Sequence, residues 1–106
     1  MNSSLEDKKN QLLAKLRKQG ISDEAVLEAL AEIPREDFIA DYLRAQAYEN
    51  AALPIESEQT ISQPFIVAYM TQELRVDKSH KVLEVGTGSG YQAAVLAKLC
   101  KRLFTI

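Results

Sequence analysis

A glycine-rich turn at residues 86–90, with the sequence GTGSG, is the segment most suited to chemistry. It directly follows the short β-rich run Lys81–Val85 and precedes an apolar stretch typical of a helix from about Tyr91 to Leu99. Gly86 allows a sharp turn, Gly88 lets the backbone approach a ligand without a Cβ, and Gly90 permits close packing of helix on strand. Free N–H groups at a helix start favour a negatively charged or polar ligand group. The turn therefore predicts a ligand site.

The glycine spacing argues against the two most familiar nucleotide-binding loops. The dinucleotide fingerprint needs glycine at its sixth position, where this chain has Tyr91. The phosphate loop needs a lysine after its last glycine, and none follows Gly90. A dinucleotide-dependent oxidoreductase thus remains only a weaker alternative. A plain strand-to-helix connection is the other alternative, although three alternating glycines exceed what a turn requires.

Helical periodicity in the first half of the chain predicts the elements that must support this site. Ser4 is suited to cap a first helix that ends at Gly20, and Ser22 to cap a second that Pro34 stops. A third short helix is expected from Pro34 or Arg35. The first two helices have apolar faces, formed by Leu5, Leu12, Leu13 and Leu16 and by Val26, Leu27, Leu30 and Ile33.

The stretch 48–63 has neither helical nor strand periodicity and is predicted to be a loop. A loop of this length in a small domain is usually functional or disordered. Pro64 suits the first turn of a fourth helix, with Ser62 or Gln63 as its cap. On the residues alone, capping is a sufficient role for Ser62, and a functional role is compatible with it.

The last part of the chain has the pattern of one βαβ unit, with a second strand at Leu103–Ile106. Such a unit implies parallel pairing and a right-handed crossover. Glu84 lies in the apolar first strand, where an unpaired carboxylate would be costly, so a polar partner or a functional role is expected. The fold class predicted is α/β, with a helical segment at 1–58 and a βαβ-containing segment at 59–106.

Composition excludes several classes of protein. The 106 residues carry 13 basic and 15 acidic side chains, and this slightly acidic balance argues against nucleic-acid binding. No apolar run reaches the roughly 18 residues of a membrane span, and the N-terminus does not resemble a signal peptide. A single cysteine, Cys100, excludes an internal disulfide and a multi-cysteine metal site, and is expected to be a small buried apolar residue. We expect a cytoplasmic protein with no metal.

Two segments together resemble a known enzyme family. VLEVGTGSGYQAAVLAKL is similar to motif I of class I S-adenosylmethionine-dependent methyltransferases. QTISQPFIVAYMT resembles the hallmark segment of the protein-L-isoaspartate (D-aspartate) O-methyltransferases, and IPREDF and AYENAALPI also fit that family. The resemblance extends from about Leu12 to Ile106. It implies a Rossmann-like fold and methylation of isoaspartyl or D-aspartyl residues in damaged proteins and peptides, as a step in repair.

The resemblance also implies roles for individual residues. Ser62 matches the family's active-site serine, and Thr60 and Ile61 would lie with it over the substrate carboxylate. Glu84 would orient the turn or receive the amino group of S-adenosylmethionine through water. The turn would line the methionine and ribose side of that cofactor through Gly86, Thr87, Gly88, Ser89 and Gly90. A carboxylate is already ionised at neutral pH, so positioning and removal of water suffice, without a base or metal.

The pattern departs from the family in its extent, because it provides two strands where a class I methyltransferase has about seven. We therefore expect an incomplete sheet with an uncovered face, and no residue to hold the cofactor ribose. The chain alone would then self-associate through open strands or be partly ordered, bind S-adenosylmethionine weakly and lack measurable turnover. A non-catalytic module that binds a partner or the cofactor is the competing interpretation.

Overall fold

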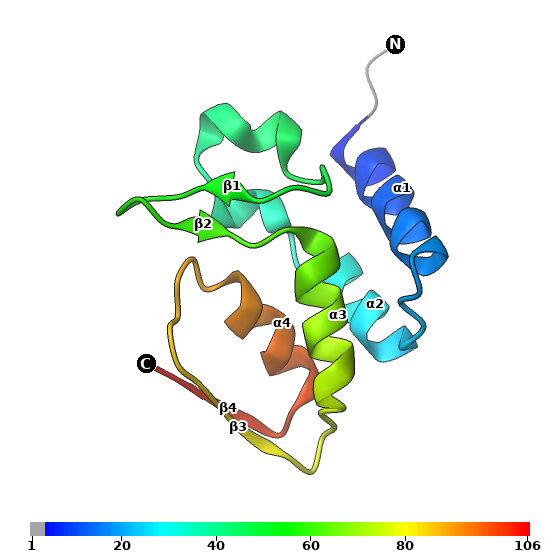
Figure 1. The fold of residues 1–106 in the computed structure, drawn as a ribbon, viewed down its shortest axis with the longest axis vertical. Coiled ribbons are helices and arrows are strands. Elements are labelled where there is room, and N and C mark those ends of the chain that lie inside the picture. Colours follow the sequence, from blue (N-terminus) through cyan, green and yellow to red (C-terminus); the bar gives the residue numbers. More distant parts are fainter. Residues whose placement is uncertain (1–3) are drawn as a thin grey trace.

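The computed structural model describes residues 4–106 and follows the predicted order of helices and strands (Figure 1). Helix α1 spans Leu5–Lys18, and the Ser4 hydroxyl accepts a hydrogen bond of 3.1 Å from the amide of Asp7, as predicted. Gly20 follows with a φ of +105°, which suits glycine at a helix end. Residues 1–3 of the predicted helical segment lie outside the described part.

The prediction that Ser22 caps the second helix was wrong. Helix α2 spans Glu24–Glu32, and the carboxylate of Asp23 accepts hydrogen bonds from the first-turn amides. The amide of Ser22 instead donates to Gln72 Oε1 at 2.8 Å, which ties the start of α2 to the next long helix. Aspartate wins here because it is one residue closer to the helix and reaches two amides.

The expected third helix is divided into two short 3-10 helices, η1 at Arg35–Phe38 and η2 at Asp41–Gln46. Ile39 has an extended backbone, with φ −132° and ψ 165°, and interrupts them. The predicted loop 48–63 contains a hairpin of two short antiparallel strands, β1 at Leu53–Pro54 and β2 at Thr60–Ile61. Two-residue strands are too short to show an alternating pattern, so the sequence did not reveal them.

The rest of the chain confirms the predicted helix and βαβ unit. Helix α3 spans Pro64–Leu74, strand β3 Lys81–Glu84, helix α4 Tyr91–Leu99 and strand β4 Arg102–Thr105. The two strands pair in parallel, with Lys81 opposite Arg102. Figure 1 shows the β1–β2 hairpin near the start of α3 and the β3–β4 pair near its end.

The apolar core forms around α2, which contacts α1, α3 and α4. The fully buried members of this core include Leu16, Val26 and Val95, and Cys100 is also buried, as predicted. The strand pair is covered less well. Its exposed apolar side chains are Leu83 at 63% and Phe104 at 51%, and the residues directly after the two strands, Val85 and Ile106, are 77% and 75% exposed. Among the described residues no helix is both long and apolar enough to cross a bilayer.

Candidate functional site

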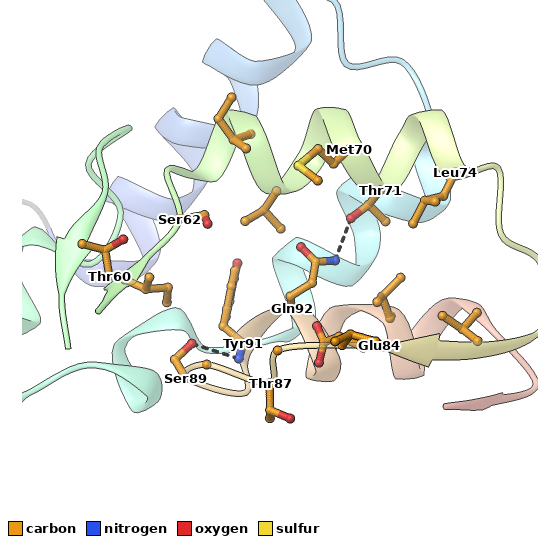
Figure 2. A pocket seen from close by; sticks show the side chains of 18 of the residues that line it. Thr60, Ser62, Met70, Thr71, Leu74, Glu84, Thr87, Ser89, Tyr91 and Gln92 are labelled. Carbon is orange, nitrogen blue, oxygen red and sulfur yellow. Dashed lines mark hydrogen bonds between the residues drawn. The ribbon is translucent and has the colours of Figure 1, made fainter. Parts of the chain in front are cut away.

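A cleft of about 420 Å³ lies between α3, the end of β3, the glycine turn and the start of α4 (Figure 2). It brings together the two groups of predicted site residues, although about 20 residues separate them in sequence. The lining includes the predicted residues Thr60, Ile61, Ser62, Glu84, Gly86, Thr87, Gly88 and Ser89. Gly90 does not line the cleft and instead precedes α4 as its N-cap.

The glycine turn has a backbone that only glycine adopts easily. Gly86, Gly88 and Gly90 have φ angles of +90°, +56° and +87°. Apart from the adjoining residues of the chain, no heavy atom lies within 4 Å of where a Cβ would stand at Gly86 or Gly88, so open space adjoins both positions. The amide of Gly86 donates to the Ile106 carbonyl at 2.8 Å, and the amide of Gly90 donates to the Thr87 carbonyl at 3.0 Å. The first hydrogen bond ties the turn to the end of the strand pair, and the second closes the turn itself.

Glu84 has the polar partner that the sequence analysis required. The hydroxyl of Thr105 on β4 donates to the Glu84 carboxylate at 2.7 Å. The hydroxyls of Thr105 and Thr87 lie 2.6 Å apart, and since Thr105 has only one proton to give, Thr87 donates to Thr105. A carboxylate at the end of β3 is thus oriented by a short chain of hydroxyl groups that reaches into the glycine turn.

Three polar residues of the cleft lining, Thr71, Tyr91 and Gln92, were not selected in the sequence analysis. The amide of Tyr91 donates to Ser89 Oγ at 3.1 Å, so Ser89 satisfies one free N–H of α4. Gln92 Nε2 donates to Thr71 Oγ1 at 2.9 Å and joins α4 to α3 across the cleft. Tyr91 and Gln92 directly follow the turn, so their position was an available signal; Thr71 gave none, because only the tertiary fold brings it near.

Ser62 occupies the junction between β2 and α3 and has an exposed side chain. Of the two caps predicted for α3, Gln63 occupies the N-cap position and Ser62 does not, although the Gln63 side chain makes no capping hydrogen bond. The first-turn amide of Phe65 donates instead to Asn50 Oδ1 at 3.0 Å, and Gln63 Nε2 donates to the Asn50 carbonyl at 3.1 Å. The side chain that accepts the first-turn amide therefore comes from a residue distant in sequence, and the Ser62 hydroxyl is not needed for it. Ile61 is only 3% exposed and belongs mainly to the core.

A buried arginine lies behind this junction. Arg35 has no exposed surface, and its Nη2 donates to the Ser62 carbonyl at 2.9 Å. Burial lowers the pKa of the Arg35 guanidinium from its usual range, although arginine stays protonated in proteins. Near it, burial raises the pKa of Tyr48, and a hydrogen bond from the Tyr48 hydroxyl to Glu36 adds to this.

Within residues 4–106, no three His, Cys, Asp or Glu side chains are placed to hold a metal ion. The cleft instead presents a glycine turn with open space beside it, one oriented carboxylate and the accessible hydroxyls of Thr60 and Ser62. This set of groups suits an organic ligand with charged and polar groups on the turn side. On the opposite side, the Ser62 hydroxyl suits a second ligand that accepts a hydrogen bond. The exposed apolar side chains of α3, including Ile66 and Met70, line the space between the two.

Comparison with known proteins gives one consistent result. The family model described as protein-L-isoaspartate(D-aspartate) O-methyltransferase matches residues 7–106. A protein-L-isoaspartate O-methyltransferase of Parvibaculum lavamentivorans is 62% identical over 101 residues, which are 95% of this chain and 46% of that protein. The one from Rhodospirillum rubrum is 52% identical over 97% of this chain and 47% of its own length. The chain thus spans about half the length of these relatives.

Solved structures agree with the sequence comparison. A protein-L-isoaspartate O-methyltransferase superposes with a TM-score of 0.79 at 34% identity, over 92% of this chain and 33% of that one. A Plasmodium falciparum structure, described as a putative protein-L-isoaspartate O-methyltransferase in complex with S-adenosyl-L-homocysteine, has a TM-score of 0.70 at 27% identity. That match covers 82% of this chain and 39% of the other.

Proposed function

The chain belongs to the protein-L-isoaspartate(D-aspartate) O-methyltransferase family, and on this premise we propose that its cleft binds S-adenosylmethionine and an isoaspartyl carboxylate for methyl transfer. The observation that carries the proposal is the meeting of the glycine turn and the Ser62 junction in one cleft. The substrates would be damaged proteins or peptides that carry isoaspartyl or D-aspartyl residues.

The turn side fits the cofactor by its chemistry. Gly86 and Gly88 leave space without a Cβ, and the oriented carboxylate of Glu84 suits the amino group of the methionine portion. Thr87 and Ser89 would line the same portion of the ligand, while Gly90 supports the turn as the N-cap of α4. When bound, S-adenosylmethionine supplies an electrophilic methyl group on a positively charged sulfur.

The Ser62 side fits the carboxylate. Its exposed hydroxyl is free to donate to a carboxylate oxygen, with Thr60 and Ile61 beside it. Since a carboxyl of this kind has a pKa of about 4, it is ionised at neutral pH and needs no general base. Ser62 would hold a carboxylate oxygen toward the methyl group that S-adenosylmethionine supplies, and no residue of this chain would need to give or take a proton. The protein's part is alignment and exclusion of water, to which the apolar side chains of α3 contribute.

A binding assay tests the proposal most cleanly, because it needs only the cleft. We expect equilibrium dialysis to show binding of radiolabelled S-adenosylmethionine, and of an isoaspartyl peptide in preference to the same peptide with normal aspartate. Ser62→Ala should weaken peptide binding by about one to two decades, the effect of one hydrogen bond to a charged group, and leave cofactor binding unchanged. Ser22→Ala, an exposed serine outside the cleft, is the matched control. Equal binding of both peptides would contradict the proposal.

We also propose that the strand pair self-associates through its exposed face. Leu83 and Phe104 lie side by side in the parallel register and are more than half exposed, and an exposed apolar patch of this kind marks an interaction surface. Sedimentation equilibrium should show association that Phe104→Lys weakens, whereas Tyr42→Lys, at an exposed aromatic outside the sheet, leaves it unchanged. A monomer at all concentrations would refute self-association. The cytoplasmic location expected from the sequence stays a prediction.

A further inference from the structure

Arg35 is the one buried charged side chain of the described residues, and the site as proposed assigns it no role. Its guanidinium donates to three backbone carbonyls, two in the stretch between η2 and β1 and one in the junction between β2 and α3. Nε donates to Ala47 at 2.8 Å, and Nη2 donates to Ala51 at 3.4 Å and to Ser62 at 2.9 Å. The stretch before β1 and the junction after β2 are therefore held against one side chain.

The same guanidinium also contacts the other side of the cleft. Its central carbon lies 5.0 Å from the ring centroid of Tyr91, a distance typical of a cation–π interaction. Tyr91 begins α4 directly after the glycine turn, and its amide donates a hydrogen bond to Ser89 Oγ. Figure 2 shows the Tyr91 phenol rising from the start of α4 toward the junction that carries Ser62. One side chain thus touches both the Ser62 junction and the helix that the turn precedes.

A buried charge of this kind is an expensive way to gain stability. Removing an ion from water costs several kcal/mol, and apolar replacements of similar volume are often neutral or stabilising. Arg35 Nη1 is also buried without a hydrogen-bond partner among the described residues. What arginine supplies and an apolar residue lacks is a rigid, planar fork whose donors point in fixed directions. Geometry is therefore the stronger reason for its presence.

We propose that Arg35 is a positioning residue that sets the distance between the Ser62 hydroxyl and the glycine turn. The proposal rests on the proposed function, because this distance matters only if the two sides hold the two reactants. In-line transfer tolerates little error, and a displacement of about 1 Å costs about a hundredfold in rate. Arg35 acts through the backbone and does not touch either ligand.

The first test follows amide hydrogen exchange in the ligand-free chain. In Arg35→Lys, which keeps the charge and loses the fork, protection in residues 59–63 should fall about tenfold, the effect of one hydrogen bond. Helix α1 should keep its protection. Leu12→Ala, a buried core substitution in α1, is the control and should lower protection throughout the chain. Unchanged protection at 59–63, or a uniform loss like that of Leu12→Ala, would overturn the positioning role.

A second variant keeps the test decisive if the lysine ammonium disrupts folding. Arg35→Met has similar length and no charge to bury, so it should fold and still lose protection at 59–63. Its isoaspartyl-peptide affinity should fall about tenfold or more, while S-adenosylmethionine affinity changes less than threefold. If both affinities and the exchange at 59–63 match the unsubstituted chain, Arg35 does not position Ser62. If the unsubstituted chain binds neither ligand, the proposed function fails, and the exchange result alone decides whether Arg35 holds the junction.

Discussion

The two sides of the cleft are held in place by different means. The glycine turn at 86–90 depends mainly on its own backbone, with three positive φ angles and a hydrogen bond from the Gly90 amide to the Thr87 carbonyl. A second hydrogen bond joins the Gly86 amide to the carbonyl of Ile106, directly after β4. The Ser62 junction depends on side chains from elsewhere, with Arg35 bonded to the Ser62 carbonyl and Asn50 capping the helix that follows. The turn is encoded mainly by local backbone conformation, with added contacts to the end of the strand pair, whereas the junction is encoded by tertiary contacts.

This difference suits the proposed roles. A cofactor is the same molecule in every catalytic cycle, so a turn with a fixed backbone can serve it. A protein substrate varies around its isoaspartyl residue, but the carboxylate to be aligned is always the same group, and Arg35 and Asn50 hold the junction that would receive it. The comparison predicts that substitutions in the turn affect mainly cofactor binding, and that substitutions behind the junction affect mainly the substrate side.

The largest effect is expected for Gly88→Val. A β-branched side chain at a φ of +56° costs about 1–3 kcal/mol in backbone strain, and its Cβ would enter the space proposed for the cofactor. We expect S-adenosylmethionine affinity measured by calorimetry to fall by at least about two decades. Gly20→Val, also at a positive φ but outside the cleft, is the matched control and should keep cofactor affinity. Unchanged affinity in Gly88→Val would remove Gly88 from the site.

A smaller effect is expected for Asn50→Ala, which removes the cap of α3. Loss of a helix cap should lower the free energy of unfolding by about 1 kcal/mol in urea titration. Asn50→Asp keeps an acceptor oxygen and should retain most of this stability. Ser62→Ala should stay within about 0.5 kcal/mol of the unsubstituted chain, because Ser62 does not cap the helix. A larger stability loss for Ser62→Ala than for Asn50→Ala would reverse the assignment of the cap.

The smallest effect is a loss of folding stability at alkaline pH through Tyr48, which lies beside Arg35. The amide of Arg35 donates to the Tyr48 hydroxyl at 3.1 Å, and burial raises the pKa of Tyr48 above its ordinary value of 10.0. Above pH 10 the unfolded chain loses this proton while the folded protein keeps it, so stability falls as pH rises. In urea titrations from pH 9 to 11, Tyr48→Phe should lose stability less steeply. An identical slope in both proteins would mean that Tyr48 is not the titrating group.

The sequence predicted best what local rules control. The turn, the bounds of α4 and the parallel strand pair follow from glycine conformation and short-range periodicity, and the structure confirms them. It predicted the Ser62 side poorly, since Asn50 lies 15 residues from Phe65 and Arg35 lies 27 residues from Ser62. Neither the Asn50 contact nor the Arg35 contact produces a periodic pattern in the sequence from which it could be predicted. Ser62 itself entered through resemblance, and its exposed position leaves that assignment a proposal.

Two features of the fold that the sequence did not reveal have simple physical causes. Asp23 replaced Ser22 as the cap of α2 because both residue types suit that position and only geometry distinguishes them. The β1–β2 hairpin was missed because its pairing depends on buried Leu53 and Ile61 meeting across a turn. Where two neighbouring residues suit the same cap position, or a strand has only two residues, the sequence alone does not identify the cap or the strand.

The most direct test of two reactants meeting in this cleft is amide chemical-shift mapping of the chain by nuclear magnetic resonance. Titration with S-adenosylhomocysteine should shift residues 84–92, and later addition of an isoaspartyl peptide should shift residues 59–63. The same peptide with normal aspartate should leave 59–63 in place. Shifts from the cofactor analogue that fall outside the turn, or peptide shifts that spare the Ser62 junction, would contradict the account.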